Sequence, residues 1–222
     1  LKEREADAVW FLLAAQSPFK EENTSFKQRE TMLKMMLEGE KDLFICDIEN
    51  NLPKPSYSID TLKALKKIHP DAKFSWLIGS DQIKDLNKWK DFKTLNKLVQ
   101  FIVYEREGYE EAHPYPVVKG SKINVSSTEI REGKSYLTKP EILNYMMHEN
   151  LYLNTICKNN MSPYRYEHTL RVTDLAVSLG SVHHLDLKKI RLIGMCHDLC
   201  KEYDMDEMTK MMKKHYPLSL VM

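Results

Sequence analysis

Short apolar runs alternate with amphipathic stretches through residues 1–150. The runs that favour strands are 8–16, 42–48, 73–81, 98–106 and 122–125. Helical periodicity occupies 25–39, 58–70 and 83–98, and a further helix is expected to begin in "SSTEIREG" (126–133). Strands that alternate with helices are typical of βαβ units, so we predict an α/β fold with a doubly wound, mostly parallel sheet.

Two of these predictions are specific enough to test in detail. The first strand, "AVWFLLAAQ", is expected to be buried because both of its faces are apolar. The helix over 58–70 places Leu62, Leu65 and Ile68 on one face and is expected to end before Pro70.

From about Asn154 the pattern becomes helical throughout, with no further strand candidate. We therefore expect two domains, 1–153 and 154–222, the second built from helices alone. The 33 basic and 32 acidic residues give a formal charge of +1, which argues against a broad nucleic-acid surface.

The chain has no apolar run of about 18 residues, which argues against a membrane span. Its N-terminus has no signal-peptide pattern. Four scattered cysteines do not form the dense framework of a small secreted domain, so we predict a cytoplasmic protein.

Polar clusters follow several predicted strands, at the sheet edge where open α/β folds bind ligands. Ser126 and Thr128 offer hydroxyls and free N–H groups at a helix start, and Arg131 can reach the same anion. The alternative is an ordinary N-cap, which Ser and Thr supply in most proteins. Gly79 permits close backbone approach, and Asp81 could accept a hydrogen bond from a ribose hydroxyl.

Trp89 offers a flat face for stacking an aromatic ring, although a core position in the helix 83–98 is the alternative. In order, these stretches resemble the bacterial nicotinate mononucleotide adenylyltransferases over residues 1–153. The matching motifs are Pro18-Phe19-Lys20, "SYSIDTL" (56–62), "IGSDQ" (78–82) with Trp89, "FIVYER" (101–106), "VSSTEIR" (125–131) and "ENLYL" (149–153).

The resemblance implies a Rossmann-like nucleotidyltransferase that joins nicotinate mononucleotide to ATP, with Mg²⁺, to form deamido-NAD and pyrophosphate. It assigns Ser58 and Trp89 to the nicotinate ring and places Arg106 on the pyridine nucleotide side. The residues that it assigns to nucleotide binding are Lys20, Gly79, Asp81, Ser126, Thr128 and Arg131.

The chain departs from the family pattern at three places. Phe19 stands where the family has histidine, and Ser58 stands where it usually has threonine. The family's first strand and its histidine-bearing phosphate loop are not in this sequence. We therefore expect the full-length protein to carry an N-terminal extension, and this chain alone to transfer adenylyl groups poorly.

The segment "GMCHDLCKEY" (194–203) concentrates residues of metal or redox chemistry. On a continuous helix His197 and Lys201 share an inward stripe, whereas Cys196 and Cys200 lie beside Ile193. A zinc knuckle needs a second ligand pair, and a redox pair needs a tighter spacing than C-x-x-x-C. Packing as small buried hydrophobes is therefore the preferred interpretation of both cysteines.

His168, on an amphipathic helix beside Leu170, Val172 and Leu175, completes a different pattern. With "CHDLCKE" it resembles the HD-domain phosphohydrolases, in particular a bacterial family that cleaves diadenosine tetraphosphate. The resemblance implies that His168, His197 and Asp198 bind a divalent iron, manganese or zinc ion and that Lys201 acts on phosphate charge. Further family ligands are expected beyond Met222, so this chain should retain metal weakly.

The leading hypothesis is a two-part enzyme of NAD biosynthesis and nucleotide phosphate hydrolysis. Its expected partners are ATP, nicotinate mononucleotide and a nucleotide phosphate, with no membrane and no nucleic acid. The alternative is that the first domain is a non-catalytic nucleotide-binding or docking module and only the HD domain is enzymatic. The pattern leaves the oligomeric state open, a homo-oligomer included.

Overall fold

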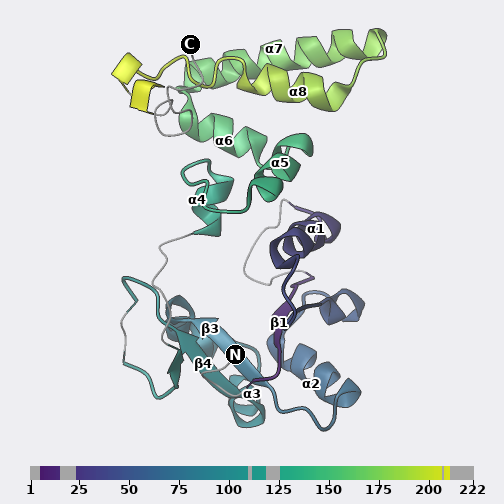
Figure 1. Ribbon diagram of the computed structural model, residues 1–222, viewed down its shortest axis with the longest axis vertical. Coiled ribbons are helices and arrows are strands. Elements are labelled where there is room, and N and C mark those ends of the chain that lie inside the picture. Colours follow the sequence, from purple (N-terminus) through teal and green to yellow (C-terminus); the bar gives the residue numbers. More distant parts are fainter. Residues whose placement is uncertain (1–5, 16–23, 110–111, 119–125, 207, 211–222) are drawn as a thin grey trace. The chain divides into compact units, whose positions relative to one another are not determined.

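The computed structural model describes residues 6–15, 24–109, 112–118, 126–206 and 208–210. It divides into two compact units, 1–124 and 125–222, which are described separately (Figure 1). Residues 126–153, which the sequence assigns to the first domain, therefore pack with the helices that follow them. The functional boundary near Asn154 stays a prediction.

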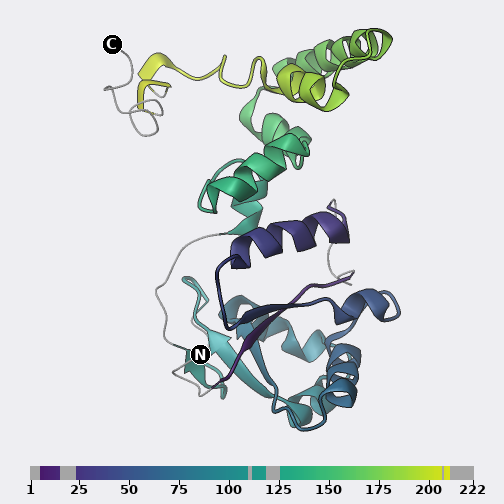
Figure 2. The same ribbon diagram turned by 45° about the vertical axis from the view of Figure 1, so that its right-hand side comes forward.

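The strands of the first unit are parallel, as predicted. β1 (Val9–Leu12) pairs with β2 (Leu43–Cys46). β3 (Ser75–Gly79), β4 (Gln100–Tyr104) and β5 (Val117–Val118) form a second parallel sheet in that order. Figure 2 shows the helices lying against these strands. The predicted strand 122–125 lies outside the described residues.

Burial of the first strand was overestimated. Trp10 is 39% exposed and Phe11 is 38% exposed, so neither face of β1 is fully covered by the described residues. The apolar run correctly indicates a strand, but a run of this kind does not reveal how many neighbours the strand has.

α1 (Phe26–Leu37) begins where the sequence predicts a helix. Its N-cap, Ser25, forms a capping box with Gln28, and the chain leaves the helix through Gly39 at a φ of +87°. η2 (Ile48–Asn51) then leads to α2 (Ser58–Ile68). Leu62 and Leu65 are buried as predicted, but Ile68 is 60% exposed, so the last residue of α2 lies outside the core.

The predicted single helix over 83–98 is wrong. η3 (Ser80–Lys88) is a 3₁₀-helix, and α3 (Phe92–Leu98) follows after a break. The apolar positions Ile83, Leu86 and Trp89 recur every three residues, which is the period of a 3₁₀-helix. Asp91 then adopts a left-handed conformation with a φ of 50°, and aspartate is one of the few residues that tolerate it.

The core of this unit lies between α2, η3, α3 and the sheet of β3 and β4. Phe101 and Val103 of β4 are almost fully buried there, and Trp89 packs against the cluster from its edge. The buried members are Ile59, Leu62, Ile78, Leu86, Leu95, Val99, Phe101 and Val103.

The described part of the second unit is helical throughout, as predicted. Its helices are α4 (Ser127–Arg131), α5 (Pro140–His148), α6 (Leu153–Asn160), α7 (Pro163–Val182) and α8 (Leu187–Cys196). α7 and α8 approach closely because Gly194 faces Thr173. A Cβ at Gly194 would stand 3.0 Å from the Thr173 Cα. None of the described helices is long and apolar enough to cross a membrane.

The helix that should carry "GMCHDLCKEY" ends earlier than predicted. α8 stops at Cys196, and turns follow through Glu202, with Lys201 N–H donating to the Asp198 carbonyl. The predicted inward stripe shared by His197 and Lys201 is therefore wrong. Gly194 and Met195 are the buried residues at the end of α8 instead.

The interpretation of the neighbouring residues changes accordingly. Cys196 is half-buried and packs against the core of Leu153, Cys157, Met161 and Met195. Cys200 is exposed, so its prediction as a buried hydrophobe is wrong. Ile193 and Leu175 are 67% and 63% exposed, so helical phase alone misplaced both.

Candidate functional site

The two histidines and the aspartate predicted as metal ligands come together in the second unit. His168 lies on α7, and His197 and Asp198 directly follow α8. One ligand atom of each lies within 4.8 Å of the others. The two imidazole rings are 5.9 Å apart between centroids. The close α7–α8 contact at Gly194 thus brings residues from distant parts of the sequence to one point.

The hydrogen bond of His197 determines which of its ring nitrogens can bind a ligand. Its Nδ1 lies 2.7 Å from the Gly194 carbonyl oxygen, which can only accept, so Nδ1 carries the proton. In the neutral ring Nε2 is then an acceptor, and it lies 3.7 Å from Asp198 Oδ2. A backbone carbonyl that fixes the tautomer in this way is a common second partner of metal-binding histidines.

Asp198 is buried, at 7% exposure, and is held between two cations. Arg165 Nη1 lies 2.6 Å from Oδ2, and Lys201 Nζ lies 3.3 Å from Oδ1. Burial on its own would raise the pKa of this carboxyl, but the hydrogen bonds from Arg165 and Lys201 outweigh it and lower the pKa. The carboxylate is therefore ionised at neutral pH.

These donors fit a divalent transition metal. A neutral imidazole with a free Nε2 and an ionised carboxylate are ligands that iron, manganese and zinc accept. Arg165 and Lys201 would share the carboxylate with a bound cation and oppose it electrostatically, so the three ligands alone favour weak binding. The Lys201 side chain is 62% exposed, which places it where a phosphate could reach it.

Sequence reasoning missed two residues that hold this site in place. Arg165 bonds Asp198 and also donates through Nε to Glu202 Oε1, at 3.1 Å. Glu202 accepts in turn from the backbone N–H and the hydroxyl of Ser162, the N-cap of α7, both at 2.6 Å. The one available signal was the position of Arg165 on the His168 helix, one turn before the histidine.

A second group of predicted residues meets at the carboxyl ends of β3 and β4. Arg106 Nε lies 3.4 Å from Asp81 Oδ1, and the Arg106 backbone N–H donates to the Ser80 hydroxyl at 2.9 Å. A Cβ at Gly79 would stand 2.2 Å from the Asp81 carboxylate and 3.0 Å from Arg106 Nε. A glycine at this position therefore permits the contact between Asp81 and Arg106.

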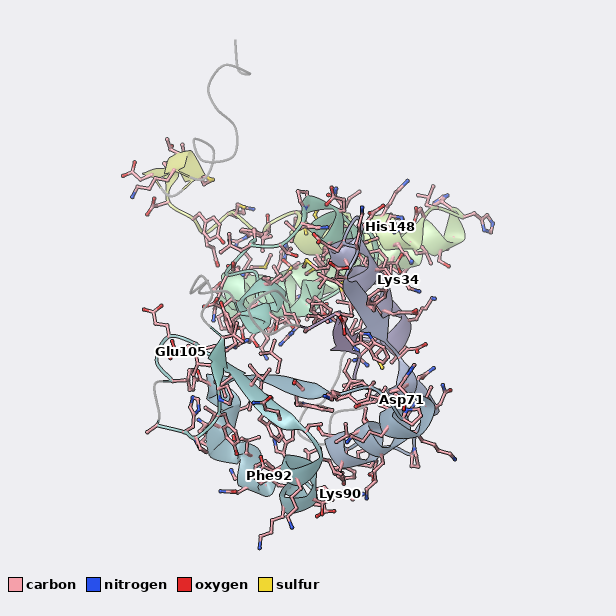
Figure 3. The ribbon with its side chains drawn as sticks, turned by 60° about the horizontal axis from the view of Figure 1, so that its bottom comes forward. Lys34, Asp71, Lys90, Phe92, Glu105 and His148 are labelled. Carbon is pink, nitrogen blue, oxygen red and sulfur yellow. The ribbon has the colours of Figure 1, made fainter. Side chains whose placement is uncertain are left out.

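Ser58 and Trp89 lie on neighbouring segments of the same unit. Ser58 is the first residue of α2, and Trp89 stands at the break after η3. Lys90 joins the two segments, because its Nζ lies 2.8 Å from Asp60 Oδ2 and 4.4 Å from the centroid of the Tyr57 ring (Lys90 is labelled in Figure 3).

Trp89 has part of its surface in the core and part in solvent. Its ring meets Phe101 edge to face at 6.2 Å between centroids, and the side chain is half-buried. The packing interpretation and the stacking interpretation are therefore compatible, since one face can pack while another remains available.

The predicted anion site at the start of α4 has the geometry of an N-cap. The Ser126 hydroxyl accepts from the Thr128 backbone N–H at 3.2 Å, and Arg131 Nη2 donates to the Thr128 hydroxyl at 2.9 Å. These three residues belong to the second unit, so their relation to Asp81 and Trp89 stays a prediction. Lys20 lies outside the described residues.

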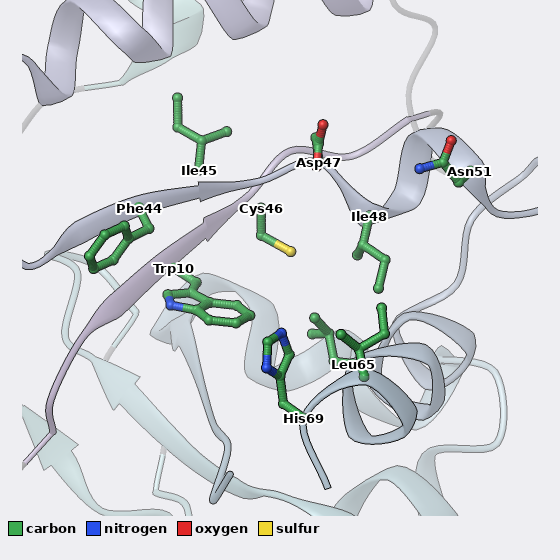
Figure 4. Close-up of a pocket in the computed structure, with 10 residues that line it drawn as sticks. Trp10, Phe44, Ile45, Cys46, Asp47, Ile48, Asn51, Leu65 and His69 are labelled. Atoms are coloured by element: carbon green, nitrogen blue, oxygen red, sulfur yellow. The ribbon is translucent and has the colours of Figure 1, made fainter.

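The first unit also has a cavity of about 600 Å³ between the β1–β2 sheet and α2 (Figure 4). Apolar side chains such as Trp10 and Phe44 dominate its lining, and the His69 ring lies beside that of Trp10, 5.1 Å away between centroids. None of the residues predicted for nucleotide binding or metal binding lines this cavity.

The cytidylyltransferase-like family model matches residues 1–133 of the chain, which is more than half of it. The chain belongs to the cytidylyltransferase-like family. A relative from Halalkalibacterium halodurans, named "Probable nicotinate-nucleotide adenylyltransferase", is 40% identical over 159 residues. The match covers 66% of this chain and 77% of the relative.

This cytidylyltransferase-like protein also matches the HD domain model over residues 165–220, the region that holds His168, His197 and Asp198. A Mycoplasma genitalium protein named "Probable nicotinate-nucleotide adenylyltransferase/Ap4A hydrolase" is 29% identical over 222 residues. The match covers 94% of this chain and 61% of that protein. The chain thus spans about three fifths of the relatives that combine both names.

A solved structure supports the fold. Plasmodium falciparum nicotinic acid mononucleotide adenylyltransferase, complexed with NaAD, superposes with a TM-score of 0.56 at 22% identity. The alignment covers 66% of this chain and 82% of that one. The α/β nucleotidyltransferase fold followed by a helical HD region is therefore established, and both parts of the predicted family resemblance are confirmed.

Proposed function

We propose that the first part of this protein transfers an adenylyl group from ATP to nicotinate mononucleotide, releasing pyrophosphate. The observation that carries the proposal is the cluster of Gly79, Asp81 and Arg106 at the carboxyl ends of adjacent parallel strands. Ligands of open α/β sheets bind at that edge. The names of the similar proteins supply the substrate class.

The roles of individual residues follow from their chemistry. Asp81 would hold a ribose hydroxyl, Arg106 would face the pyridine nucleotide, and Trp89 with Ser58 would receive the nicotinate ring. The residues proposed for ATP are Lys20, Ser126, Thr128 and Arg131, with Mg²⁺ accompanying the triphosphate. Catalysis in such a transfer rests mostly on positioning and charge stabilisation.

The test is formation of deamido-NAD from ATP and nicotinate mononucleotide, followed by chromatography, together with calorimetric titration of each nucleotide. Because aromatic stacking contributes about 1–3 kcal/mol, Trp89→Ala should weaken nicotinate mononucleotide binding by roughly tenfold or more. Trp10→Ala, at a half-exposed tryptophan of the same unit, is the control and should leave it unchanged. Equal losses in both variants would contradict the proposed role of Trp89.

The alternative, a non-catalytic nucleotide-binding module, makes a different prediction in the same experiment. It allows selective binding of nicotinate mononucleotide or ATP but no deamido-NAD. Binding without product, in a chain that is folded by circular dichroism, would favour this alternative over adenylyl transfer.

We further propose that the HD region hydrolyses a nucleotide phosphate of the diadenosine tetraphosphate class. His168, His197 and Asp198 would hold a divalent metal, which when bound supplies charge neutralisation and an activated water. His197 presents Nε2 because Gly194 fixes its tautomer. Lys201, which is exposed beside Asp198, would contact the phosphate.

Metal binding tests this second proposal directly. Manganese titrated into the protein and followed by electron paramagnetic resonance should show weak binding that His197→Ala abolishes. His183→Ala, at the C-cap of α7, is the control and should bind as the wild type does. Hydrolysis of diadenosine tetraphosphate in the presence of manganese should likewise be lost in His197→Ala and retained in wild type and His183→Ala. Equal metal binding by wild type and His197→Ala would overturn the assignment.

A further inference from the structure

A buried carboxylate in the first unit belongs to none of the sites described above. Glu49, in the 3₁₀-helix η2 that follows β2, is only 5% exposed. A buried charge is costly unless hydrogen bonds satisfy it, so a buried glutamate usually has a structural or functional reason. Its partners indicate what that reason is.

Three groups from two segments of the chain donate hydrogen bonds to this one carboxylate. The Ala15 backbone N–H, three residues past the end of β1, donates to Oε2 at 3.2 Å. The Ser56 hydroxyl, just before α2, donates to the same oxygen. The Thr61 hydroxyl, in the first turn of α2, lies 2.8 Å from Oε1. Glu49 therefore connects the end of β1 with the start of α2.

The end of β1 is also held from its other side. Arg29 of α1 donates to the Ala14 carbonyl at 2.6 Å and to the Ala15 carbonyl at 3.3 Å. Hydrogen bonds with both α1 and η2 therefore fix the position of Ala15. Because Ala15 in turn donates to Glu49, they also restrict the position of the Glu49 carboxylate.

The other end of the connection is the segment that carries Ser58. In sequence, Ser58 lies between Ser56 and Thr61, the two residues whose side chains donate to Glu49. The Thr61 backbone N–H donates to the Tyr57 carbonyl oxygen at 3.1 Å, which closes the first turn of α2 and leaves the hydroxyl proton for Glu49. The N-cap of α2, Tyr57, makes no side-chain capping hydrogen bond. The hydrogen bonds from Ser56 and Thr61 to Glu49 therefore help to stabilise the first turn of α2.

We propose that Glu49 is a positioning residue for the pyridine nucleotide, acting through Ser58 without touching the substrate itself. The inference rests on the proposed adenylyl transfer. It specifies that Glu49 positions the residues proposed for the nicotinate ring and has no effect on the proposed ATP residues of the second unit.

The experiment is Glu49→Gln, which keeps the shape but replaces one acceptor oxygen with an N–H donor facing other donors. Binding of nicotinate mononucleotide should weaken by about tenfold, the equivalent of about 1.4 kcal/mol, while ATP binding stays within about twofold. Glu40→Gln, an exposed glutamate of the same unit, makes the same charge change and should alter neither affinity. Equal loss of both nucleotides, or no loss, would overturn the proposal.

A measurement without ligand separates this inference from the proposed function. In Glu49→Gln, amide hydrogen exchange should accelerate at Ala15 and across 57–61 but not in α3. Thr61→Val, a milder change that removes one donor, should accelerate 57–61 alone. Unchanged exchange in both variants would contradict the role of Glu49. If the wild type bound no pyridine nucleotide, the adenylyl-transfer proposal would fail, and exchange would still decide whether Glu49 fixes the first turn of α2.

Discussion

A single carboxylate organises the candidate metal site. Asp198 is at once a predicted metal ligand, the partner of Arg165 and the partner of Lys201. The sequence pattern was sufficient to predict that His168, His197 and Asp198 would meet. It could not predict Arg165, because the two carboxylates that Arg165 bonds lie more than 30 residues away along the chain. Charge pairs between distant segments are visible only once the fold brings them together.

Another aspartate gives a clean test of local electrostatics. Asp186 caps α8, accepting from the N–H groups of Lys188 and Lys189 at 3.1 and 3.2 Å. The backbone hydrogen bond from Lys189 is the main cause that lowers the pKa of this carboxyl. A lowered folded-state pKa stabilises the fold at pH values above the unfolded pKa, and that stabilisation is lost as the pH falls through the folded pKa.

Asparagine still caps the helix, but it removes the negative charge at the helix N-terminus. Asp186→Asn should therefore lower the melting temperature at pH 7 by a few degrees. The difference from wild type should shrink as the pH falls below about 3.9, the ordinary aspartate value. Circular dichroism melts between pH 7 and pH 3 measure this. A difference that stays constant with pH would mean that the charge contributes nothing.

At the scale of elements, the strands and the ends of α1 and α2 were predictable, but the break between η3 and α3 and the end of α8 were not. The helical periodicity over 25–39 and the parallel strands at β3 and β4 were local signals that the structure confirms. The break at Trp89 depends on competition between 3₁₀ and α geometry in η3, whereas α8 ends at Cys196 in a series of turns. Apolar residues three apart satisfy both helices over a short stretch, so tertiary packing makes the choice.

The α7–α8 contact that brings the site residues together can be tested with two glycines. In Gly194→Ala the new methyl group would meet the Thr173 backbone, which cannot move aside, so the variant should lose about 1–2 kcal/mol despite the better helix propensity of alanine. In Gly180→Ala the methyl group meets the flexible end of Ile190, so stability should be nearly unchanged. Urea unfolding compares the two. Equal stabilities would show that the close approach is not required.

At the scale of the whole molecule, each unit has a hydrophobic core of its own. The core of the first unit is built around Phe101, and that of the second around Met195. The predicted chemistry divides in part along the same line: Asp81 and Trp89 lie in the first unit, whereas the metal ligands and the proposed ATP residues Ser126, Thr128 and Arg131 lie in the second. Separate cores lead us to expect that the proposed pyridine nucleotide site and the proposed metal site are energetically independent.

The last prediction follows from that independence. Substitutions in separate cores that share no interaction partners usually have additive effects. Asp198→Asn should abolish manganese binding and leave nicotinate mononucleotide affinity within about twofold of wild type, and Trp89→Ala should do the reverse. Calorimetry measures the nicotinate mononucleotide affinity and electron paramagnetic resonance measures manganese binding, each in both single variants and in the double variant. If Asp198→Asn shifted nucleotide affinity tenfold, the two units would be coupled and their separate cores would not describe the energetics of the protein.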